Sequence, residues 1–499
     1  MWTRWLLTVV LAVMSLLTAQ GVGGQEISLD VTEQTLTNGM KLLIVPMRSS
    51  FTFSAYLRFK IGSAQEQAGK TGLSHMLEHM MFKGTRLIGA VDTEAEEPIL
   101  EKLDGLHQEL SKLHEAEQSP LTLKDPGRRL ALEKEIAETT ATLKRFIIPN
   151  EFWQIYQRHG AVGLNASTSR DGTQYHVSLP SNRLELWAFL ESDRIENPVF
   201  RDFYTERAVV REERRQRYEA NPEGALLESL FALAFAAHPY RNPVIGWPSD
   251  TENLLRPDAM RHFKTFYAPN NMVAVLVGDL DPERTARIIE EEFGSIPPQP
   301  LPELRITQEP PQRGERRASI RFDAQPRMMI GYHIPALGHA DTYALQVAAT
   351  ILGSGRTSRF YRGLIDGKRL ASSIEASTTP NRDPGLLIIS AVPRAPHTLE
   401  ELEKGIDAEI ERLKESIVTD RELQRVRTQL EADLVRSLRS PASLAAQLGS
   451  AQALAGDWRY LLESRKRMKA VTADDVQRAV KTYLAPENRT VATLLPAKP

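Results

Sequence analysis

The chain has 499 residues, of which 41% are hydrophobic and 25% charged, and its mean hydropathy is −0.33. This composition is typical of a globular protein with two to four domains and excludes a largely disordered or membrane-embedded chain. The 62 Lys and Arg nearly balance the 64 Asp and Glu, so the basic surface of a nucleic-acid-binding protein is not expected. The sequence contains no Cys, so any bound metal must be held by His and carboxylate side chains.

The N-terminus has the features of a secretory signal peptide. Arg4 precedes an uncharged apolar run from Trp5 to Leu17, and small or polar residues follow at 18–21. This run is shorter than the roughly 20 residues that span a bilayer, so cleavage is expected rather than an uncleaved membrane anchor. Residues 1–24 are therefore predicted to be a signal peptide. The mature protein is expected to be exported, with the periplasm as its compartment, and to have no membrane attachment.

Strands and helices are interspersed in the N-terminal part of the chain. Residues 51–61 alternate between apolar and polar side chains, which predicts a half-buried strand. Asn38-Gly39 lies between short apolar runs and predicts a hairpin, and a second hairpin is expected at 164–179. Apolar residues at helical spacing predict a helix over 71–82. Together these elements indicate an α+β fold.

Residues 94–147 follow a different pattern. Leucine and isoleucine recur every three or four residues within a strongly charged segment that Pro120, Pro126 and Gly127 interrupt. This spacing predicts a helical hairpin inserted between the helix at 71–82 and the hairpin at 164–179. We expect a self-packed surface feature, with partner binding as the alternative.

One pattern occurs twice in the chain, 217 residues apart. Each copy has a Lys-Thr pair, then Ala-Pro, then Asn, and an apolar strand follows. The two copies are Lys264-Thr265, Ala268-Pro269 and Asn271, and Lys481-Thr482, Ala485-Pro486 and Asn488. The repeat predicts two homologous domains of about 200 residues each.

A proline-rich stretch between the two copies predicts a semi-rigid linker. The predicted domain boundaries are therefore 25–296 for the first domain, which includes the insertion at 94–147, 297–315 for the linker and 316–499 for the second domain.

The helix predicted at 71–82 contains His-x-x-Glu-His, formed by His75, Glu78 and His79. One helical turn separates the two imidazoles, so both can bind a single Zn²⁺ at about 2.0–2.1 Å. Glu78 lies between them and is placed to reach a metal-bound water. A chance match is expected only about 0.03 times in a chain of this composition. The alternative is a solvated polar helix face with two incidental histidines.

A third metal ligand must come from elsewhere in the chain. The acidic helix predicted around 201–219 contains Glu206, Glu212 and Glu213. Glu206 and Glu213 are seven residues apart and nearly share one helical face, whereas Glu212 points elsewhere. The periodicity alone leaves the choice of ligand open.

These residues, with several other segments, resemble the pitrilysin/insulinase family of zinc metallopeptidases, in its mitochondrial-processing-peptidase-like branch of two-domain bacterial proteins. His-x-x-Glu-His inverts the His-Glu-x-x-His of common zinc peptidases and is typical of inverzincins. The matching segments span nearly all of the mature chain. They are 72–79, 82–85, 165–168, 206–213, 268–271 and 352–355.

The resemblance implies a zinc endopeptidase with one zinc per chain. It implies two homologous half-domains, each a mostly antiparallel sheet packed with helices, of which only the first is catalytic. It further implies Glu213 as the third ligand beside His75 and His79, Glu206 as a supporting acid, and Glu78 as the general base. His79 and Glu213 are 134 residues apart, more than in the family pattern, and the inserted hairpin accounts for the difference.

A peptide substrate is expected to bind in an extended form. It would add a strand along Asn165, Ala166, Ser167 and Thr168 through main-chain hydrogen bonds. The alternative function is a non-catalytic scaffold or assembly subunit on the same fold, in which the metal motif is expected to be lost.

The chain departs from the family pattern in its second half. Active members carry an Arg there and, seven residues later, a Tyr, which face the zinc and bind the substrate carbonyl. The corresponding positions here are Ile365 and Ser372, which cannot supply these donors. Arg362 or Arg369 could substitute only with a register shift of three or four residues. We therefore predict a heterodimer with a related subunit that supplies Arg and Tyr, and a homodimer as the second choice.

Overall fold

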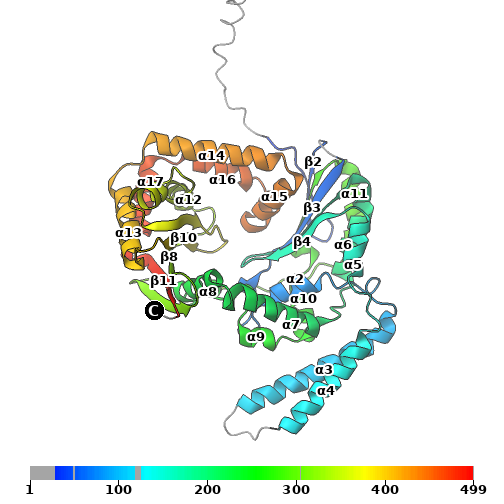
Figure 1. Ribbon diagram of the computed structural model, residues 1–499. Coiled ribbons are helices and arrows are strands. Elements are labelled where there is room, and N and C mark those ends of the chain that lie inside the picture. Colours follow the sequence, from blue (N-terminus) through cyan, green and yellow to red (C-terminus); the bar gives the residue numbers. More distant parts are fainter. Residues whose placement is uncertain (1–27, 49–50, 119–124, 304, 498–499) are drawn as a thin grey trace, which may run out of the picture.

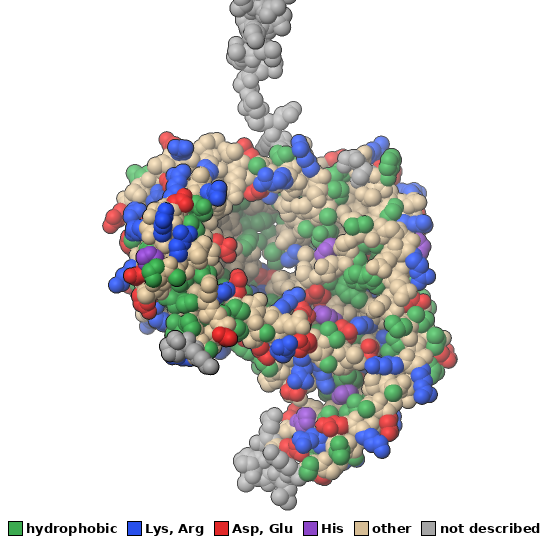
Figure 2. All heavy atoms as spheres, in the orientation of Figure 1, with side chains coloured by type: hydrophobic (Ala, Val, Ile, Leu, Met, Phe, Trp, Pro, Cys, Tyr) green, Lys and Arg blue, Asp and Glu red, His purple; other side chains and the backbone are tan. Residues whose placement is uncertain are grey.

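The computed structural model describes residues 28–48, 51–118, 125–303 and 305–497, so the predicted signal peptide lies outside the described residues. Two β-sheets, one from each half of the chain, stand on opposite sides of an open centre, with helices packed around them (Figure 1). In space-filling view the surface is hollowed between the two halves (Figure 2). Within the described ranges, no helix is both long and apolar enough to cross a bilayer.

The N-terminal half contains a six-stranded sheet with the order β1-β2-β6-β3-β5-β4. β2 and β6 are parallel and the other neighbours are antiparallel. The strands are β1 (Thr32–Thr35), β2 (Lys41–Pro46), β3 (Thr52–Phe59), β4 (Val162–Thr168), β5 (Thr173–Pro180) and β6 (Met272–Gly278). The helices are α2 (Leu73–Met80), α3 (Thr93–Gln118), α4 (Pro126–Leu143), α5 (Glu151–Arg158), α6 (Leu184–Glu196), α7 (Phe203–Arg214), α8 (Pro222–Ala234), α9 (Pro248–Glu252), α10 (Arg256–Phe266) and α11 (Pro282–Phe293).

The C-terminal half repeats this topology in a five-stranded sheet with the order β7-β11-β8-β10-β9. β7 and β11 are parallel, as β2 and β6 are, and the other pairs are antiparallel. The strands are β7 (Arg316–Phe322), β8 (Arg327–Ile334), β9 (Ala371–Thr378), β10 (Gly385–Pro393) and β11 (Arg489–Pro496). The helices are α12 (Ala340–Gly353), α13 (Leu399–Glu415), α14 (Asp420–Leu438), α15 (Pro441–Ala455), α16 (Tyr460–Ala470) and α17 (Ala473–Tyr483).

The repeated Ala-Pro-x-Asn segment has the same structural role in both halves. Asn271 donates its side-chain amide to the carbonyl of Phe266 at 2.9 Å, at the end of α10. Asn488 donates in the same way to the carbonyl of Tyr483 at 2.7 Å, at the end of α17. Each Asn thereby satisfies a helix C-terminal carbonyl just before the central strand of its sheet begins. The sequence repeat therefore reflects a shared local structure, and the predicted α+β fold with two homologous, mostly antiparallel half-domains is confirmed.

Each half lends a helix to the sheet of the other half (Figure 1). α15 from the C-terminal half packs on β3 and β6, where Leu448 lies among apolar residues of both halves. α8 from the N-terminal half packs on β7, β8 and β11, where Leu230 is fully buried. Both faces of the central strands are covered in this way, so the side chains of β6 are buried along its whole length.

The predicted helical hairpin is present as α3 and α4, which pack against each other and project from the body beside α7 (Figure 1). We call α3 and α4 together the arm. Residues 119–124, between the two helices, lie outside the described residues.

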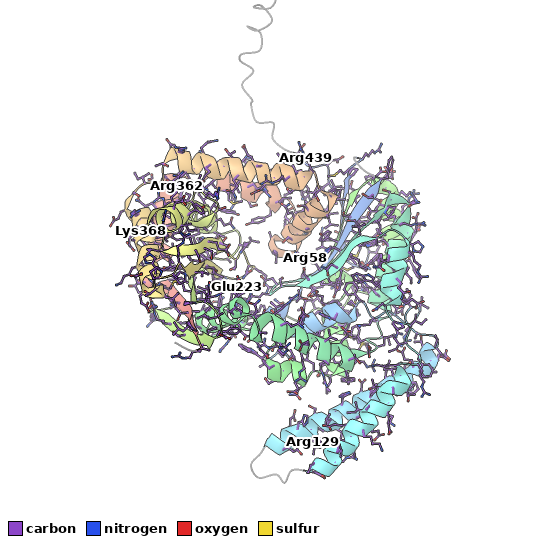
Figure 3. All side chains as sticks on the ribbon, in the orientation of Figure 1. Arg58, Arg129, Glu223, Arg362, Lys368 and Arg439 are labelled. Carbon is purple, nitrogen blue, oxygen red and sulfur yellow. The ribbon has the colours of Figure 1, made fainter. Side chains whose placement is uncertain are left out.

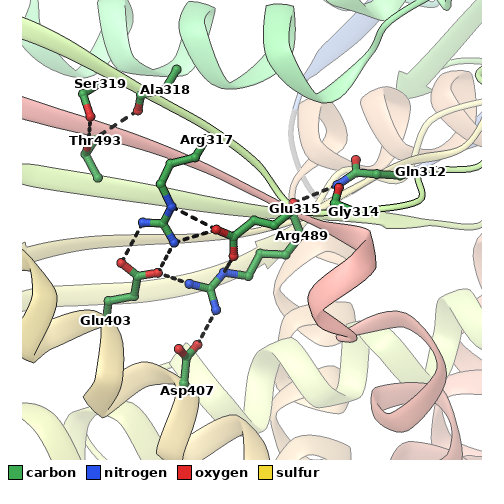
Figure 4. Close-up of polar contacts among 10 residues, drawn as sticks. All are labelled: Gln312, Gly314, Glu315, Arg317, Ala318, Ser319, Glu403, Asp407, Arg489 and Thr493. Carbon is green, nitrogen blue, oxygen red and sulfur yellow. Dashed lines mark hydrogen bonds and ion pairs between the residues drawn. The ribbon is translucent and has the colours of Figure 1, made fainter.

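The segment that joins the halves is fixed to each of them. The Glu309 carboxylate accepts the backbone N–H groups of Ala236, Ala237 and His238, just after α8. Near β7, Arg489 forms ion pairs with Glu315 at 3.1 Å, with Asp407 at 2.8 Å and with Glu403 (Figure 4). Arg317 pairs with the same two glutamates, so these charges hold the first strand of the second sheet to α13.

Two predicted elements differ slightly in extent from those observed. The helix predicted over 71–82 is α2, which begins at Leu73 because Gly72 has a φ of 88° and no helical conformation. The strand predicted over 51–61 is β3, which ends at Phe59. The Asn38-Gly39 hairpin is present between β1 and β2, with Gly39 at a φ of 86°.

Candidate metal centre

The first turn of α2 is held in place by the carboxylate of Glu66. Glu66 accepts the N–H of Gly72 at 2.7 Å and that of Ser74 at 2.6 Å. These are N-terminal donors that have no partner within the helix. A Cβ atom at Gly72 would lie 2.4 Å from the carbonyl oxygen of Ile245, so only glycine fits this position. The start of α2 is thereby fixed before any metal binds.

α2 and α7 pack side by side and bring three candidate ligands together. Glu213 Oε2 lies 3.3 Å from His79 Nε2 and 3.7 Å from His75 Nε2. One ligand atom from each of the three residues lies within 4.8 Å of the others. Ligand atoms of a tetrahedral zinc are about 3.3–3.6 Å apart for bond lengths of about 2.0–2.2 Å. Two imidazoles and one carboxylate at these distances fit a zinc ion that keeps an open coordination position.

In the metal-free protein the pKa values of the two histidines are shifted in opposite directions. Burial, together with the neighbouring His79, lowers the pKa of His75 to about 4. Burial also acts to lower the pKa of His79, but the carboxylates of Glu206 and Glu213 outweigh it and raise this pKa to about 9. The carboxylates of Glu206 and Glu213 therefore stabilise positive charge on His79 in the absence of a metal. The same negative charge favours the binding of a divalent ion.

The neighbouring acids on α7 divide as their spacing predicts. Glu206 lies 3.2 Å from His79 Nδ1, the ring nitrogen on the other side from Glu213. A carboxylate in this position fixes the ring orientation of a metal-binding histidine. Glu212, in contrast, is exposed and pairs with Arg215. The geometry thus separates Glu206 and Glu213 from Glu212.

Glu78 lies between the two histidines in the sequence, and a residue of the sheet binds its carboxylate. Its Oε2 accepts a hydrogen bond from Thr168 Oγ1 at 2.6 Å. Burial raises the pKa of Glu78, which makes the group more basic than an exposed carboxylate. Thr168 is the last residue of β4, so the strand expected to bind substrate ends at the metal centre.

β4 is an edge strand, since among the described strands it pairs only with β5. Asn165 and Ser167 are exposed, whereas Ala166 is buried against the core. The unpaired edge offers backbone donors and acceptors to an extended peptide. The four predicted substrate-binding residues therefore all lie on a free strand edge beside Glu78.

A row of polar side chains crosses the sheet from this edge. Ser167 is paired in register with Gln174 on β5, and Gln174 with Arg58 on β3. Arg58 donates to Gln174 Oε1 at 3.1 Å and lies beside the open centre (Figure 3). The wall of the N-terminal half is thus polar next to β4.

The C-terminal half places no Arg and Tyr pair at the predicted positions. Ile365 packs against the core of that half, and the Ser372 hydroxyl donates to the carbonyl of Val392 at 3.2 Å. Arg362 and Arg369 are both exposed. Arg362 lies in the C-terminal half, across the open centre from Arg58 (Figure 3).

Sequence reasoning missed three charged residues around the site. Lys83 pairs with Glu206, and Arg217 pairs with the second oxygen of Glu213 at 2.8 Å. Arg217 follows Glu213 by four residues, a helical spacing that could have identified it. Glu66 carried no sequence signal, because its partners are backbone N–H groups.

Sequence models of one peptidase family match this chain in both halves. Insulinase (Peptidase family M16) matches residues 48–97 and 141–247, and Peptidase M16 inactive domain matches residues 254–430. The chain belongs to the insulinase family, peptidase family M16. The unmatched residues 98–140 fall within the arm, which identifies most of the arm as an addition to the family fold.

Several relatives share nearly the whole length of the chain. The zinc protease PqqE of Helicobacter pylori is 27% identical over 471 residues, which cover 93% of this chain and 92% of that protein. The mitochondrial-processing peptidase subunit beta of Lentinula edodes is 24% identical over 470 residues, covering 90% and 86%. Homology to zinc proteases supports a peptidase function at the level of the family.

Solved structures show the same fold. The structure of a protease from Helicobacter pylori has a TM-score of 0.77 and 26% identity, and covers 94% of this chain and 100% of that one. The periplasmic protease PqqL from Escherichia coli has a TM-score of 0.68 at 16% identity, with 94% of this chain and 48% of that chain covered. The second likeness is one of fold alone.

Proposed function

We propose that the chain is a zinc-dependent endopeptidase that hydrolyses extended peptides or unfolded protein segments. The observation that carries the proposal is the convergence of His75, His79 and Glu213 beside Glu78, at the end of an unpaired edge strand. A scaffold protein has no use for a largely buried histidine pair, an acid between the two histidines and a free strand edge at the same place. The first half-domain, 25–296, is the catalytic one, and 316–499 is its inactive homologue beyond the linker at 297–315.

The side chains divide the catalytic work. His75, His79 and Glu213 hold one zinc, which when bound polarises the scissile carbonyl and makes a water molecule more acidic. Glu78 accepts a proton from the attacking water and delivers it to the leaving amine. Thr168 keeps the Glu78 carboxylate directed at the reacting atoms, and Glu206 holds the ring of His79.

The substrate lies along β4 as an added strand. Backbone groups of Asn165, Ala166, Ser167 and Thr168 bind the peptide main chain, so affinity depends little on the substrate's sequence. The side chains of Asn165 and Ser167 are exposed. In this arrangement they would contact the side chains of the substrate.

Metal content and turnover of a single variant test this assignment. Purified wild-type protein is expected to contain about one zinc per chain and to cleave quenched peptides in a chelator-sensitive, zinc-restored manner. Glu78→Gln should retain the zinc and lose most of the turnover, because it removes the base and leaves all three ligands. Glu212→Gln is the matched control, an exposed Glu on α7 that should change neither quantity. A zinc-free Glu78→Gln protein would overturn the role given to Glu78.

A partner subunit completes the site in this proposal. Neither Ile365 nor Ser372 offers the donors that active family members use, so a related chain supplies an Arg and a Tyr. The purified chain alone should bind zinc but cleave peptides slowly, and addition of the partner should raise kcat. Full activity of an isolated monomer or homodimer would exclude this arrangement.

The protein acts outside the cytoplasm, with residues 1–24 removed on export to the periplasm. N-terminal sequencing of protein from cells should find a mature chain that begins between about residues 20 and 25. A chain that still begins at Met1 would contradict this.

A further inference from the structure

The base of the arm contacts α7, the helix that carries Glu206 and Glu213. Asp104 on α3 accepts a hydrogen bond from the Tyr204 hydroxyl at 2.7 Å. The same carboxylate accepts Arg256 Nη2 at 2.7 Å and Nε at 3.0 Å, in a two-point pair whose side chains are mostly buried. Charge-assisted, two-point pairs of this kind fix geometry strongly. Asp104 thereby joins α3 to both α7 and α10.

His107 adds a second contact one turn along α3. Its ring stacks on the ring of Tyr204, with centroids 3.6 Å apart and planes inclined by 19°. Its Nδ1 lies 3.5 Å from Arg207 Nη2, and Arg207 also donates to the carbonyl of Leu254 at 2.7 Å. Only 8% of His107 is exposed, so this contact is part of the packed interior.

α7 therefore lies between the arm and the metal centre. Tyr204 and Arg207 face the arm, whereas Glu206 and Glu213 face α2 from the other side of the helix axis. A rotation or shift of α7 that breaks the arm contacts also moves both acids. The two sets of contacts are coupled through one rigid helix.

A buried ion pair at the root of the arm acts on the same two helices. Glu96, in the first turn of α3, pairs with Arg201 at 2.9 Å, and both side chains are almost fully buried. Arg201 precedes α7 and also donates to the carbonyls of Lys83, Thr85 and Ile88, which follow α2. The arm thus contacts the exit from α2 and the entry to α7.

Beyond these residues, the exposed pair of Arg86 and Glu97 joins the loop after α2 to the first turns of α3. The other described ion pairs of the arm join α3 to α4 or lie within α4. Glu109 pairs with Arg128, and Lys102 with Glu135, all with exposed side chains. Exposed pairs contribute little to stability. The contacts with the metal-bearing helix are therefore concentrated at the root.

We propose that the arm is a brace for the metal centre, in which Asp104 and His107 are positioning residues that set α7, and with it Glu206 and Glu213, against α2. The inference rests on the proposed function in that it takes His75, His79 and Glu213 as the zinc ligands. It assigns a role in the chemistry to a part of the chain that lies outside the family match. Zinc affinity accordingly depends on residues that do not touch the metal.

Zinc affinity of the full-length protein, measured by competition with a chromogenic chelator, tests the brace. Asp104→Asn should weaken zinc binding about tenfold, at the lower end of the range for indirect ligand support. Tyr204→Phe removes the same hydrogen bond from the α7 side and should have a similar effect. The double variant should bind no more weakly than Asp104→Asn, because both changes remove one shared contact. Amide hydrogen exchange in α7 should be faster in both single variants.

Two control variants separate the brace from general destabilisation. Glu109→Gln changes an exposed acid on the same helix and should leave zinc affinity unchanged. Leu132→Ala removes a buried side chain of α4, so it should lower the thermal midpoint without changing zinc affinity. Wild-type zinc affinity in Asp104→Asn and Tyr204→Phe would overturn the brace. Failure of the wild type to bind zinc, or zinc binding by His79→Ala as tight as that of the wild type, would instead overturn the proposed function.

Discussion

The two halves of the molecule place the same helix pair on the same topology but use it differently. α2 follows β3 in the first half, and α12 follows β8 in the second. α2 meets α7, which directs Glu206 and Glu213 at its histidines. α12 meets α14, the counterpart of α7. There Arg425 donates to the carbonyls of Thr350 and Ser354, at the end of α12.

This difference shows how one scaffold holds a group of candidate metal ligands in one copy and only packing in the other. In the first half the contact between the two helices is made by titratable groups that could hold a metal ion. In the second half the same contact caps a helix, since carbonyls at a helix C-terminus need donors. Function is therefore decided by a few side chains at the helix–helix contact, while the fold is shared.

The largest expected effect comes from breaking this contact in each half. His79→Ala should abolish stoichiometric zinc binding and peptide hydrolysis, because it removes one of the three proposed ligands. Arg425→Ala should keep the zinc and lower stability by about 1.5–3 kcal/mol, the range for hydrogen bonds that involve a charged group. Elemental analysis and thermal unfolding of both variants measure the two effects. Loss of zinc from Arg425→Ala would show that the second half also shapes the metal centre.

The exchanged helices test whether the halves are independent. Leu230 in α8 and Leu448 in α15 are both fully buried against the sheet of the other half. Leu230→Ala and Leu448→Ala should each cost about 2–5 kcal/mol of unfolding free energy. If the halves unfold as one unit, both variants shift the same transition in urea. Two separate transitions, each shifted by only one variant, would contradict a shared core.

Much of this arrangement could be predicted from sequence because it depends on local periodicity. The strand at 51–61, the Asn38-Gly39 turn and the helical hairpin at 94–147 each follow from the spacing of apolar residues and turn residues. The repeat at Asn271 and Asn488 was visible because both side chains cap a helix in the same way. The separation of Glu206 and Glu213 from Glu212 also followed from helical geometry.

Other features depend on contacts between distant parts of the chain and left no sequence signal. The exchange of α8 and α15 pairs each helix with a sheet in the other half, which no local pattern encodes. Glu66 binds backbone N–H groups, so its partners have no side-chain identity to recognise. The contact of Asp104 with Tyr204 joins residues 100 positions apart. Periodicity placed these residues on helices but could not show which helices meet.

A smaller effect is expected where an acid supports a ligand without binding the metal. Glu206→Gln should weaken zinc binding about 10–100-fold, since the amide no longer offers His79 Nδ1 a charged acceptor. Glu422 on α14 is a comparable acid in the second half, where it pairs with Arg359. Glu422→Gln should leave zinc affinity unchanged. Zinc titration of both variants makes the comparison, and equal effects would remove the distinction between the halves.

The smallest effect concerns how the two equivalent helices begin. α12 is capped by the half-exposed His339, whereas α2 is capped by the buried carboxyl of Glu66. Burial raises the pKa of Glu66 from 4.5 to about 8, so the folded protein holds a proton that the unfolded chain releases. The contribution of Glu66 to stability is therefore complete below pH 4.5 and is lost as the pH rises towards and through 8.

Glu66→Gln isolates this contribution, because glutamine keeps the shape of the protonated acid but cannot ionise. The variant should cost about 1 kcal/mol near pH 4, where the wild-type carboxyl is protonated in most folded and unfolded chains, because one hydrogen bond to the helix is altered. It should also lose less stability than the wild type between pH 5 and pH 8.5. Urea unfolding of the metal-free proteins from pH 4 to pH 8.5 measures both differences, with His339→Gln as the matched change at the start of α12. Parallel pH curves for wild type and Glu66→Gln would show that Glu66 is already ionised in the folded protein, and that α2 begins on a buried charge.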